Sequence, residues 1–235
     1  MFLRAYRVRV YTANAAMVQE SLERAWRTLV DALVAAGTLR SPQILAAFCA
    51  VPRSRFVPPE HAVAAATVDA PLSIGQGQTV SQPTTVGTML EVVQPRPGEK
   101  GLDVGTGSGW QAALLSHCVG PEGKVFTMER IPELSRRAAA ALQSFSNVQP
   151  LVGDATAGLP LHAPYHVIIS AASSPEVPPP WVEQLAVNGR LLHPIAGMGL
   201  RVLRKDAVGR VSAEDHPGFV FVPLISDRRP LTPEE

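Results

Sequence analysis

Apolar residues recur at helical spacing in the first part of the chain and in short strand-like runs later. Over residues 17–36 they form one helical face, which Gly37 ends. This face comprises Val18, Leu22, Ala25, Trp26, Leu29, Val30, Leu33 and Val34. A second helix is predicted after Ser41, which is expected to cap it. The alternation over residues 1–11 fits a short edge strand or a disordered leader, and we predict the leader because the helical period begins only afterwards.

From residue 84 onward, predicted helices and strands alternate. The helices cover residues 84–93, 111–118, 132–145 and 180–185. The strands cover residues 101–104, 124–128, 148–152, 166–171, 190–195, 200–205 and 219–224. The last two strands are expected to pair as an antiparallel hairpin across a polar, glycine-containing link. This order predicts an α/β fold with a doubly wound, seven-stranded, mostly parallel sheet, a reversed edge and an N-terminal helical extension.

Length and charge limit the classes of function. A chain of 235 residues can build one large α/β domain with a helical appendage. The formal net charge of +1 gives no electrostatic case for nucleic acid or an acidic membrane, and no apolar run reaches the length of a membrane span. Cys49 and Cys118 lack metal-ligand spacing and are expected to be buried, reduced thiols, while the six histidines are dispersed. We therefore expect a cytoplasmic protein without a metal site.

The stretch GLDVGTGSGW at residues 101–110 interrupts an apolar strand with Gly105, Gly107 and Gly109. A helix is predicted directly afterwards, so free backbone N–H groups face the space above the strand's carboxyl end. That arrangement suits a nucleotide-like ligand, although an ordinary strand-to-helix turn has the same appearance. The spacing G-x-G-x-G differs from the G-x-G-x-x-G of dinucleotide sites, and no P-loop motif G-x-x-x-x-G-K-[ST] occurs.

Two acidic residues at later strand ends add to this pattern. Glu129 closes the next strand about twenty residues past the glycines, where a carboxylate can accept both hydroxyls of a ribose. Asp154 follows the strand after that and could bind an adenine edge. A ribose held beside glycines, without pyrophosphate chemistry, favours S-adenosyl-L-methionine as the ligand.

The segment between residues 51 and 83 is long for a loop in a compact domain, and such loops are usually functional or disordered. It concentrates small and hydrogen-bonding residues that could hold a polar backbone or a carboxylate: Gly75, Gln76, Gly77, Gln78, Thr79 and Ser81. A surface loop held by its own turns is the plainer alternative.

Longer motifs run through the chain from residue 51 to residue 224. They are VPRSRFVP (51–58), PLSIGQGQTVSQP (71–83), LDVGTGSGWQAALL (102–115), ERIPEL (129–134), VGDATAGLP (152–160), the run at 163–197 and FVPL (221–224). Together they resemble the protein-L-isoaspartate O-methyltransferases, and IGQGQTVSQP is the most specific because the glycine motif alone would mark only a generic methyltransferase. The resemblance implies a Rossmann-like class I methyltransferase fold. We expect the chain to comprise a leader (1–16), N-terminal helices and a substrate loop (17–83), an S-adenosyl-L-methionine-binding domain (84–227) and a tail (228–235).

The resemblance also implies roles for individual residues. Ser81 corresponds to the family's active-site serine, which we expect to orient the substrate carboxylate or the methyl donor by hydrogen bonding and not to form a covalent intermediate. The implied cofactor contacts come from the loop and the strand ends: Gln78, Thr79, Val80, Asp103, Gly105, Thr106, Gly107, Gly109, Glu129, Arg130, Asp154 and Ala155. The implied partners are isoaspartyl-containing peptides and proteins, and we expect a monomer that binds neither nucleic acid nor membrane.

Departures from the family pattern leave two further interpretations open. Ala155 stands where many members have glycine, and Val220 and the strand at 200–203 lack an arginine and a glutamine that bacterial members often carry. The chain could instead be a dedicated aspartyl methyltransferase that tailors one ribosomal peptide. It could also be a cofactor-binding module with reduced catalysis.

Overall fold

The computed structural model describes residues 2–226, with side chains described from residue 16 onward. The α-helices are α1 (Phe2–Ala35), α2 (Pro42–Ala50), α3 (Ala62–Thr67), α4 (Pro83–Val93), α5 (Trp110–Val119), α6 (Pro132–Ala141) and α7 (Pro179–Glu183). The 3-10 helices are η1 (Arg53–Phe56), η2 (Pro59–His61), η3 (Ala155–Ala157) and η4 (Pro160–His162). The strands are β1 (Leu72–Gly75), β2 (Gln78–Val80), β3 (Lys100–Val104), β4 (Lys124–Glu129), β5 (Val148–Val152), β6 (Tyr165–Ser170), β7 (Leu185–Ile195), β8 (Gly199–Lys205) and β9 (Val211–His216).

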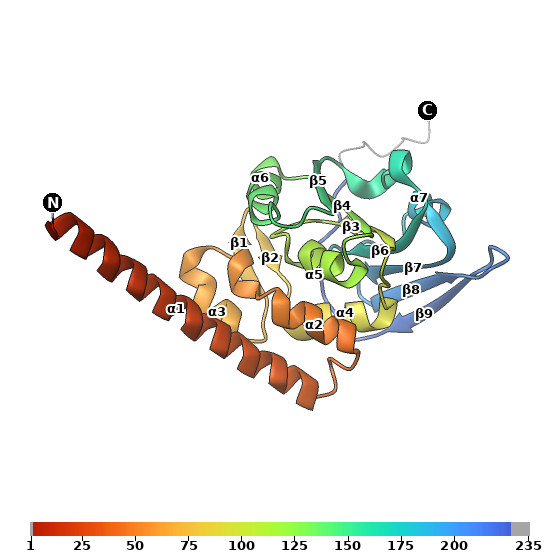
Figure 1. The fold of residues 1–235 in the computed structure, drawn as a ribbon. Coiled ribbons are helices and arrows are strands. Elements are labelled where there is room, and N and C mark those ends of the chain that lie inside the picture. Colours follow the sequence, from red (N-terminus) through yellow and green to blue (C-terminus); the bar gives the residue numbers. More distant parts are fainter. Residues whose placement is uncertain (1, 227–235) are drawn as a thin grey trace.

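Strands β3 to β9 form one seven-stranded sheet in the order β5-β4-β3-β6-β7-β8-β9 (Figure 1). The pairs from β5 to β7 are parallel, and β7–β8 and β8–β9 are antiparallel. The predicted doubly wound sheet with a reversed edge is therefore confirmed. The strand order reverses at β3, which pairs with β4 on one side and β6 on the other. In such sheets ligands bind beyond the carboxyl ends of the strands at this reversal.

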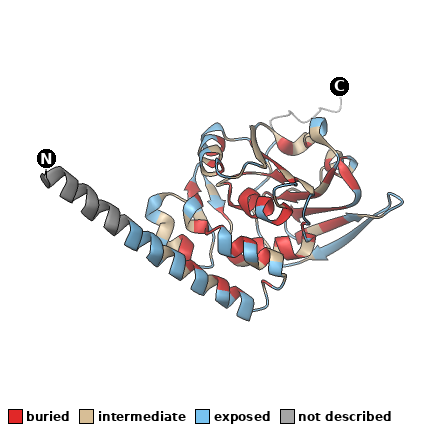
Figure 2. Cartoon of the chain, in the orientation of Figure 1, coloured by how far each residue is buried: buried red, intermediate tan, exposed pale blue. Residues whose placement is uncertain are grey.

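Two apolar cores lie on opposite faces of the sheet because side chains alternate along each strand. In β6, Val167 and Ile169 belong to one core and Ile168 to the other. The first core also takes in buried residues of α1, α2, α4 and α5, whereas the second includes Trp181 of α7. Figure 2 shows the buried residues concentrated in the central strands and in α5.

Three aromatic rings join the N-terminal helices to the sheet domain. Trp26 of α1 stacks on Phe48 of α2 with ring centroids 6.1 Å apart, and both meet Trp110 of α5 edge-on. The indole N–H groups are satisfied, because Trp26 donates to the Phe48 carbonyl and Trp110 donates to the Val51 carbonyl. Trp26 and Phe48 are thus core residues, as the sequence predicts. They dock the helical extension onto the helix that follows the glycine loop.

Helix α1 begins at Phe2, well before the predicted start at residue 17. The leader predicted over residues 1–16 is therefore wrong for residues 2–16, and residue 1 lies outside the described residues. No glycine or proline precedes Gly37, and residues 2–16 include four alanines and three arginines, which favour helix. The apolar face is also narrower than predicted, since Val18 is 59% and Val34 40% exposed. The tail predicted over residues 228–235 falls outside the described residues.

The segment at 51–83 is more ordered than a loop. It contains α3 and a two-stranded antiparallel hairpin of β1 and β2. Gln76 (φ 56°) and Gly77 (φ 70°) form the turn, and two consecutive left-handed residues match the twist of hairpin strands. The sequence GQG at 75–77 is typical of such a turn, but the flanking strands are too short to show the alternation of apolar and polar residues that predicts a strand.

The predicted strand at 219–224 is wrong, because β9 is the hairpin partner of β8. The tight turn between them forms around Asp206, whose carboxylate accepts from the backbone N–H groups of Val208 and Arg210. After β9 the chain crosses to β6, and Pro223 bridges to Ser173. The segment that follows β9 therefore reaches the carboxyl ends of the central strands.

Ser41 precedes α2 as predicted, but its side chain does not cap that helix. Its hydroxyl donates to Glu91 of α4 (2.7 Å), and the same carboxylate accepts from the backbone N–H groups of Arg40 and Ser41 (2.8 Å each). Burial works to raise the pKa of Glu91, and these hydrogen bonds outweigh it, so the net pKa is lowered. Glu91 thus ties the start of α2 to α4.

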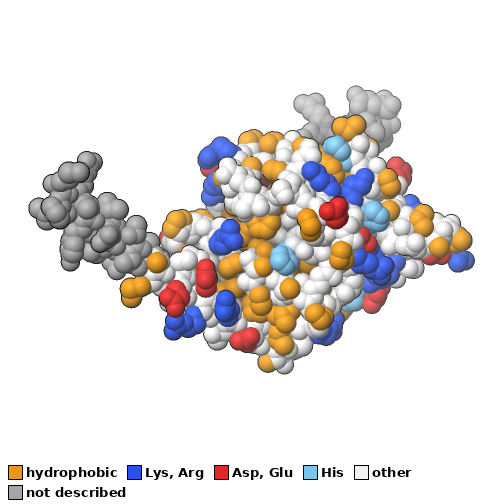
Figure 3. Space-filling model, viewed as in Figure 1, with side chains coloured by type: hydrophobic (Ala, Val, Ile, Leu, Met, Phe, Trp, Pro, Cys, Tyr) orange, Lys and Arg blue, Asp and Glu red, His pale blue; other side chains and the backbone are white. Residues whose placement is uncertain are grey.

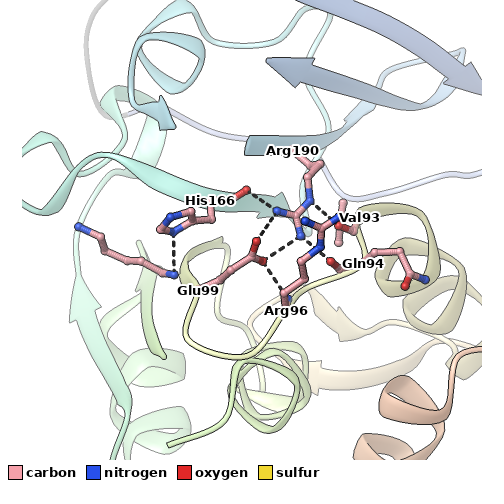
Figure 4. A network of polar contacts seen from close by, with 7 residues as sticks. Val93, Gln94, Arg96, Glu99, His166 and Arg190 are labelled. Carbon is pink, nitrogen blue, oxygen red and sulfur yellow. Dashed lines mark hydrogen bonds and ion pairs between the residues drawn. The ribbon is translucent and has the colours of Figure 1, made fainter. Parts of the chain in front are cut away.

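A buried ion pair joins elements at the amino ends of the strands (Figure 4). Arg190 of β7 makes a two-pronged contact with Glu99 at 2.7 and 2.8 Å. The same guanidinium donates to the backbone carbonyls of Val93, Gln94 and His166. Because both the charge and the carbonyls are satisfied, this network fixes the end of α4 against β7 away from the carboxyl ends of the strands.

The surface carries charges of both signs. In the view of Figure 3, Lys and Arg side chains are interspersed with Asp and Glu, and hydrophobic side chains lie between them. Cys118 is buried, which raises the pKa of its thiol to about 12, but Cys49 is exposed, so its predicted burial is wrong. Cys49 lies outside the buried face of α2, which is formed by Ile44, Ala47 and Phe48. Within the described residues, no helix combines the length and apolar character that crossing a membrane requires.

Candidate functional site

An open cavity lies at the carboxyl ends of β3, β4 and β6, where the strand order reverses. Its lining comes from the hairpin, the glycine loop, the ends of β4 and β5, and the segment after β9. The lining residues are Gln78, Thr79, Val104, Gly105, Gly107, Met128, Glu129, Arg130, Ile131, Gly153, Ala155, Ala171, Ala172, Val222, Pro223, Leu224 and Ile225. Segments that are far apart in the sequence thus meet at the predicted edge of the sheet.

The glycine loop turns across the floor of this cavity. The backbone N–H groups of Gly105 and Thr106 both donate to the Met128 carbonyl, at 3.0 and 3.2 Å. Gly107 has φ 53°, and a Cβ there would point toward Ile74 at 3.5 Å, so glycine keeps this part of the floor open. Gly109 has a different role: it precedes α5 as its N-cap with φ 90°, and a Cβ would press on Leu142 at 3.2 Å. Gly109 is therefore explained by packing and does not line the cavity.

Glu129 holds the cavity's only lining carboxylate among the described residues, at the end of β4. One carboxylate oxygen accepts from the N–H of Gly107 and the other from the N–H of Ile131, both at 2.9 Å. The side chain is 7% exposed and thus fixed in direction. Each oxygen retains acceptor capacity beyond one hydrogen bond, so the carboxylate can still receive hydroxyl groups of a ligand.

Asp103 and Thr106 belong to a chain of hydrogen bonds beneath the glycine loop. The Asp103 carboxylate accepts from Gln111 (2.7 Å) and Thr127 (2.6 Å), and Thr127 lies 2.6 Å from Thr106. Complete burial, aided by the charge of Glu129, raises the pKa of Asp103 to about 6 despite these hydrogen bonds. Asp103 does not line the cavity. It holds the loop to β4 and α5 from below.

A smaller hollow adjoins the main cavity and contains Ser81. Thr79, Gly105, Gly107 and Ala171 line both spaces. The smaller one is also lined by Val80, Ser81, Val86, Thr106, Ser108, Trp110 and Gln111. Ser81 is half-buried, and its hydroxyl makes no hydrogen bond to any described side chain or backbone group. The hydroxyl is thus available to a ligand that spans the two spaces.

The end of β5 contributes less than the sequence suggests. The Asp154 carboxylate accepts from the backbone N–H of Thr156 (2.8 Å) and from the Ser226 hydroxyl (3.0 Å). Asp154 itself does not line the cavity, whereas Ala155 and Arg130 do. Ala155 begins η3 and does not have a positive φ, so alanine instead of glycine causes no backbone strain here.

The wall formed by residues 222–225 was not predicted as part of the site. Ser173 holds it in place, because its N–H donates to the Val222 carbonyl (2.8 Å) and its carbonyl accepts from Leu224 (2.7 Å). This role was not predicted because residues 219–224 were interpreted as a strand. The FVPL motif at 221–224 is the sequence feature that could have indicated it. Met128, Ile131, Ala171 and Ala172 were also missed because they are ordinary apolar residues at strand ends.

Comparison of the sequence with known proteins gives a family match and similar relatives. The chain matches the family protein-L-isoaspartate(D-aspartate) O-methyltransferase over residues 24–229. A protein-L-isoaspartate O-methyltransferase of Aeropyrum pernix is 46% identical over 205 residues, which cover 85% of this chain and 78% of the relative. One of Pyrococcus horikoshii is 39% identical over 218 residues, covering 90% and 97%.

Solved structures give the same picture of the fold. A protein-L-isoaspartate O-methyltransferase structure superposes with a TM-score of 0.76 at 26% identity, covering 86% of this chain and 66% of that one. A Plasmodium falciparum structure of the same kind, in complex with S-adenosyl-L-homocysteine, has a TM-score of 0.74 at 20% identity, with 85% and 98% covered.

Proposed function

Because the chain belongs to the protein-L-isoaspartate(D-aspartate) O-methyltransferase family, we propose that it methylates the free carboxylate of L-isoaspartyl residues in peptides and proteins, with S-adenosyl-L-methionine as the methyl donor. The observation that carries this proposal is the junction of two spaces: the cavity with Glu129 opens beside the hollow with Ser81, and they share Thr79 and Gly107. A donor in one space and an acid in the other would meet there.

The chain's residues fit the cofactor. A bare backbone at Gly105 and Gly107 leaves space that a side chain would reduce, and the Glu129 carboxylate is aimed into the cavity by two backbone N–H groups. Glu129 would hold the ribose hydroxyls, and Met128 and Ile131 would flank the adenosyl group with apolar surface. When bound, the cofactor supplies a methyl group activated by a positively charged sulfur.

The remaining residues of the site position the substrate and the methyl donor. A side-chain or terminal carboxyl has a pKa near 4, so it is already ionised at neutral pH and requires no general base. Among the described residues that line the hollow with Ser81, none is a histidine, aspartate or glutamate that could act as a base, and the Ser81 hydroxyl can donate one hydrogen bond to the substrate carboxylate. Holding the reactants in a near-attack arrangement can supply about 7 to 11 kcal/mol. The hairpin and the 222–225 wall line the cavity on either side of the glycine loop.

The product of this step is a methyl ester on the isoaspartyl side of the peptide. The backbone nitrogen of the following residue displaces the ester methoxide and closes a succinimide ring. Water then opens the ring, and part of the product is normal aspartate. The chain's residues are needed only for the methylation, since the later steps occur in the released peptide.

A paired-peptide assay tests the proposal. The purified protein is given radiolabelled S-adenosyl-L-methionine and two peptides of one sequence, one with L-isoaspartate and one with L-aspartate. We expect methyl ester on the isoaspartyl peptide and almost none on its aspartyl partner. Transfer to neither peptide, with cofactor still bound in calorimetry, would indicate a cofactor-binding module. Preference for aspartate would indicate a tailoring enzyme, and either result contradicts the proposal.

The cellular setting is part of the same proposal. We propose a cytoplasmic monomer that binds neither nucleic acid nor membrane, supported by the near-neutral net charge and by two cysteines that are both free thiols. Light scattering on the purified protein measures the mass directly, and a dimer would contradict the monomer.

A further inference from the structure

Arg53 is a fully buried arginine outside the cavity lining, at the start of η1. Its guanidinium donates to four backbone carbonyls. They are those of Ala65 (Nε, 3.2 Å), Val68 (Nη2, 2.6 Å), Ala70 (Nη1, 2.9 Å) and Ser81 (Nη1, 3.1 Å). Four of the five N–H donors of the group are thereby used. One side chain thus gathers carbonyls that are spread over residues 65 to 81.

The Nη1 atom joins the two ends of the hairpin. Ala70 precedes β1, and Ser81 directly follows β2, so the two carbonyls belong to the base of the hairpin whose second strand lines the cavity. Nε and Nη2 fasten this base to the carboxyl end of α3, where backbone carbonyls lack helical partners. One planar group therefore ties the backbone at Ser81 to the start of the hairpin and to the end of α3.

The charge of Arg53 is held without an ion pair among the described residues. Burial lowers the pKa of its guanidinium to about 10, partly opposed by the nearby Asp69, so the group stays charged at neutral pH. Its guanidinium carbon lies 5.9 Å from the ring centroid of Trp110, and Trp110 lines the same hollow as Ser81. Asp69 in turn accepts from the backbone N–H and the hydroxyl of Thr84 at the start of α4.

We propose that Arg53 is a positioning residue for methyl transfer, which sets the Ser81 hydroxyl at the junction of the two spaces by fixing the Ser81 carbonyl and the base of the hairpin. This inference rests on the role proposed above for Ser81. Arg53 touches neither of the two spaces and acts through Ser81.

Lysine at this position keeps the charge but not the geometry. An ammonium group is a point charge with three donors and cannot reproduce the planar fork that spans these carbonyls. A displacement of about 1 Å in a positioned group can cost as much as 100-fold in rate, and we expect Arg53→Lys to lower kcat about tenfold. The affinity for S-adenosyl-L-homocysteine should be nearly unchanged, because Arg53 does not line the cavity.

A double-mutant cycle separates positioning from general support of the fold. We expect Arg53→Lys to lower kcat in the wild type but hardly at all in the Ser81→Ala background, because the group that it positions is then absent. Arg190→Lys is the matched control, since Arg190 is also a buried arginine that donates to backbone carbonyls, at the amino ends of the strands (Figure 4). Any effect of Arg190→Lys should be equal in the two backgrounds.

The outcomes distinguish the role of Ser81 from that of Arg53. If Ser81→Ala alone leaves kcat unchanged, the proposed role of Ser81 fails. If Ser81→Ala lowers kcat and Arg53→Lys lowers it by the same factor in both backgrounds, the positioning role of Arg53 is overturned. Should Arg53→Lys not fold, Asp69→Asn carries the test, because exposed Asp69 holds the same segment to Thr84. Non-additivity of Asp69→Asn with Ser81→Ala is then expected, and additivity overturns the inference.

Discussion

Ser81→Ala is expected to lower kcat on an isoaspartyl peptide about 100-fold, since the substrate carboxylate loses the hydroxyl that orients it toward the methyl group. The affinity for S-adenosyl-L-homocysteine should remain nearly unchanged, because Ser81 lines the adjoining hollow and not the main cavity. Steady-state methyl transfer and calorimetry on the same preparation measure the two quantities.

Ser73→Ala is the matched control for this variant. Ser73 pairs with Thr79 across the hairpin, is exposed and lines neither space. It should retain wild-type kcat, so a loss in both variants would indicate a general disturbance of the hairpin. A Ser81→Ala enzyme with wild-type kcat would remove Ser81 from the catalytic site.

Glu129→Ala is expected to weaken the binding of S-adenosyl-L-homocysteine about 10- to 100-fold. The ribose hydroxyls would lose a charged acceptor, and hydrogen bonds to charged groups contribute about 1.5 to 3 kcal/mol. The loss has a second source, because the N–H groups of Gly107 and Ile131 lose the acceptor that shapes the cavity floor. Isothermal titration calorimetry measures the change in Kd.

Glu122→Ala serves as the control, because Glu122 is an exposed acid in the turn before β4 and lines none of the cavity. It should bind like the wild type. Equal affinity of Glu129→Ala and the wild type would mean that Glu129 serves only as an acceptor for the two backbone N–H groups and does not bind the ligand.

The sheet and its glycine loop could be predicted because their signals are local. Strand, glycine turn and helix follow each other within residues 100–119, and Glu129 closes the adjacent strand. Parallel strands place their carboxyl ends at one edge, so proximity follows from the fold class alone. The resemblance supplied Ser81 in the same way, from a short and distinctive block of residues.

Features that depend on tertiary contacts could not be predicted. Ser41 has the sequence of a helix cap, yet its hydroxyl goes to Glu91, which is distant in the chain. Asp103 stands beside the glycine loop in sequence, but its side chain points beneath the sheet edge to Thr127 and Gln111. In each case a polar side chain had a second partner that only the folded chain provides.

The last part of the chain shows a different limit. The apolar run FVFVPL at 219–224 has the composition of a strand. Because the chain turns tightly around Asp206, however, the earlier segment β9 (Val211–His216) pairs with β8 instead. The run is then free to cross the sheet edge and form a wall of the cavity. Composition thus showed that residues 219–224 are apolar, but their place in the fold depends on the pairing of β8 with β9.

The arrangement of cofactor and substrate can be seen in a crystal structure with S-adenosyl-L-homocysteine and an isoaspartyl peptide bound together. We expect the ribose at Glu129, the cofactor sulfur over the glycine loop, and the peptide carboxylate within hydrogen-bonding distance of the Ser81 hydroxyl. A cofactor outside this cavity, or a peptide carboxylate bound away from Ser81, would contradict this expectation.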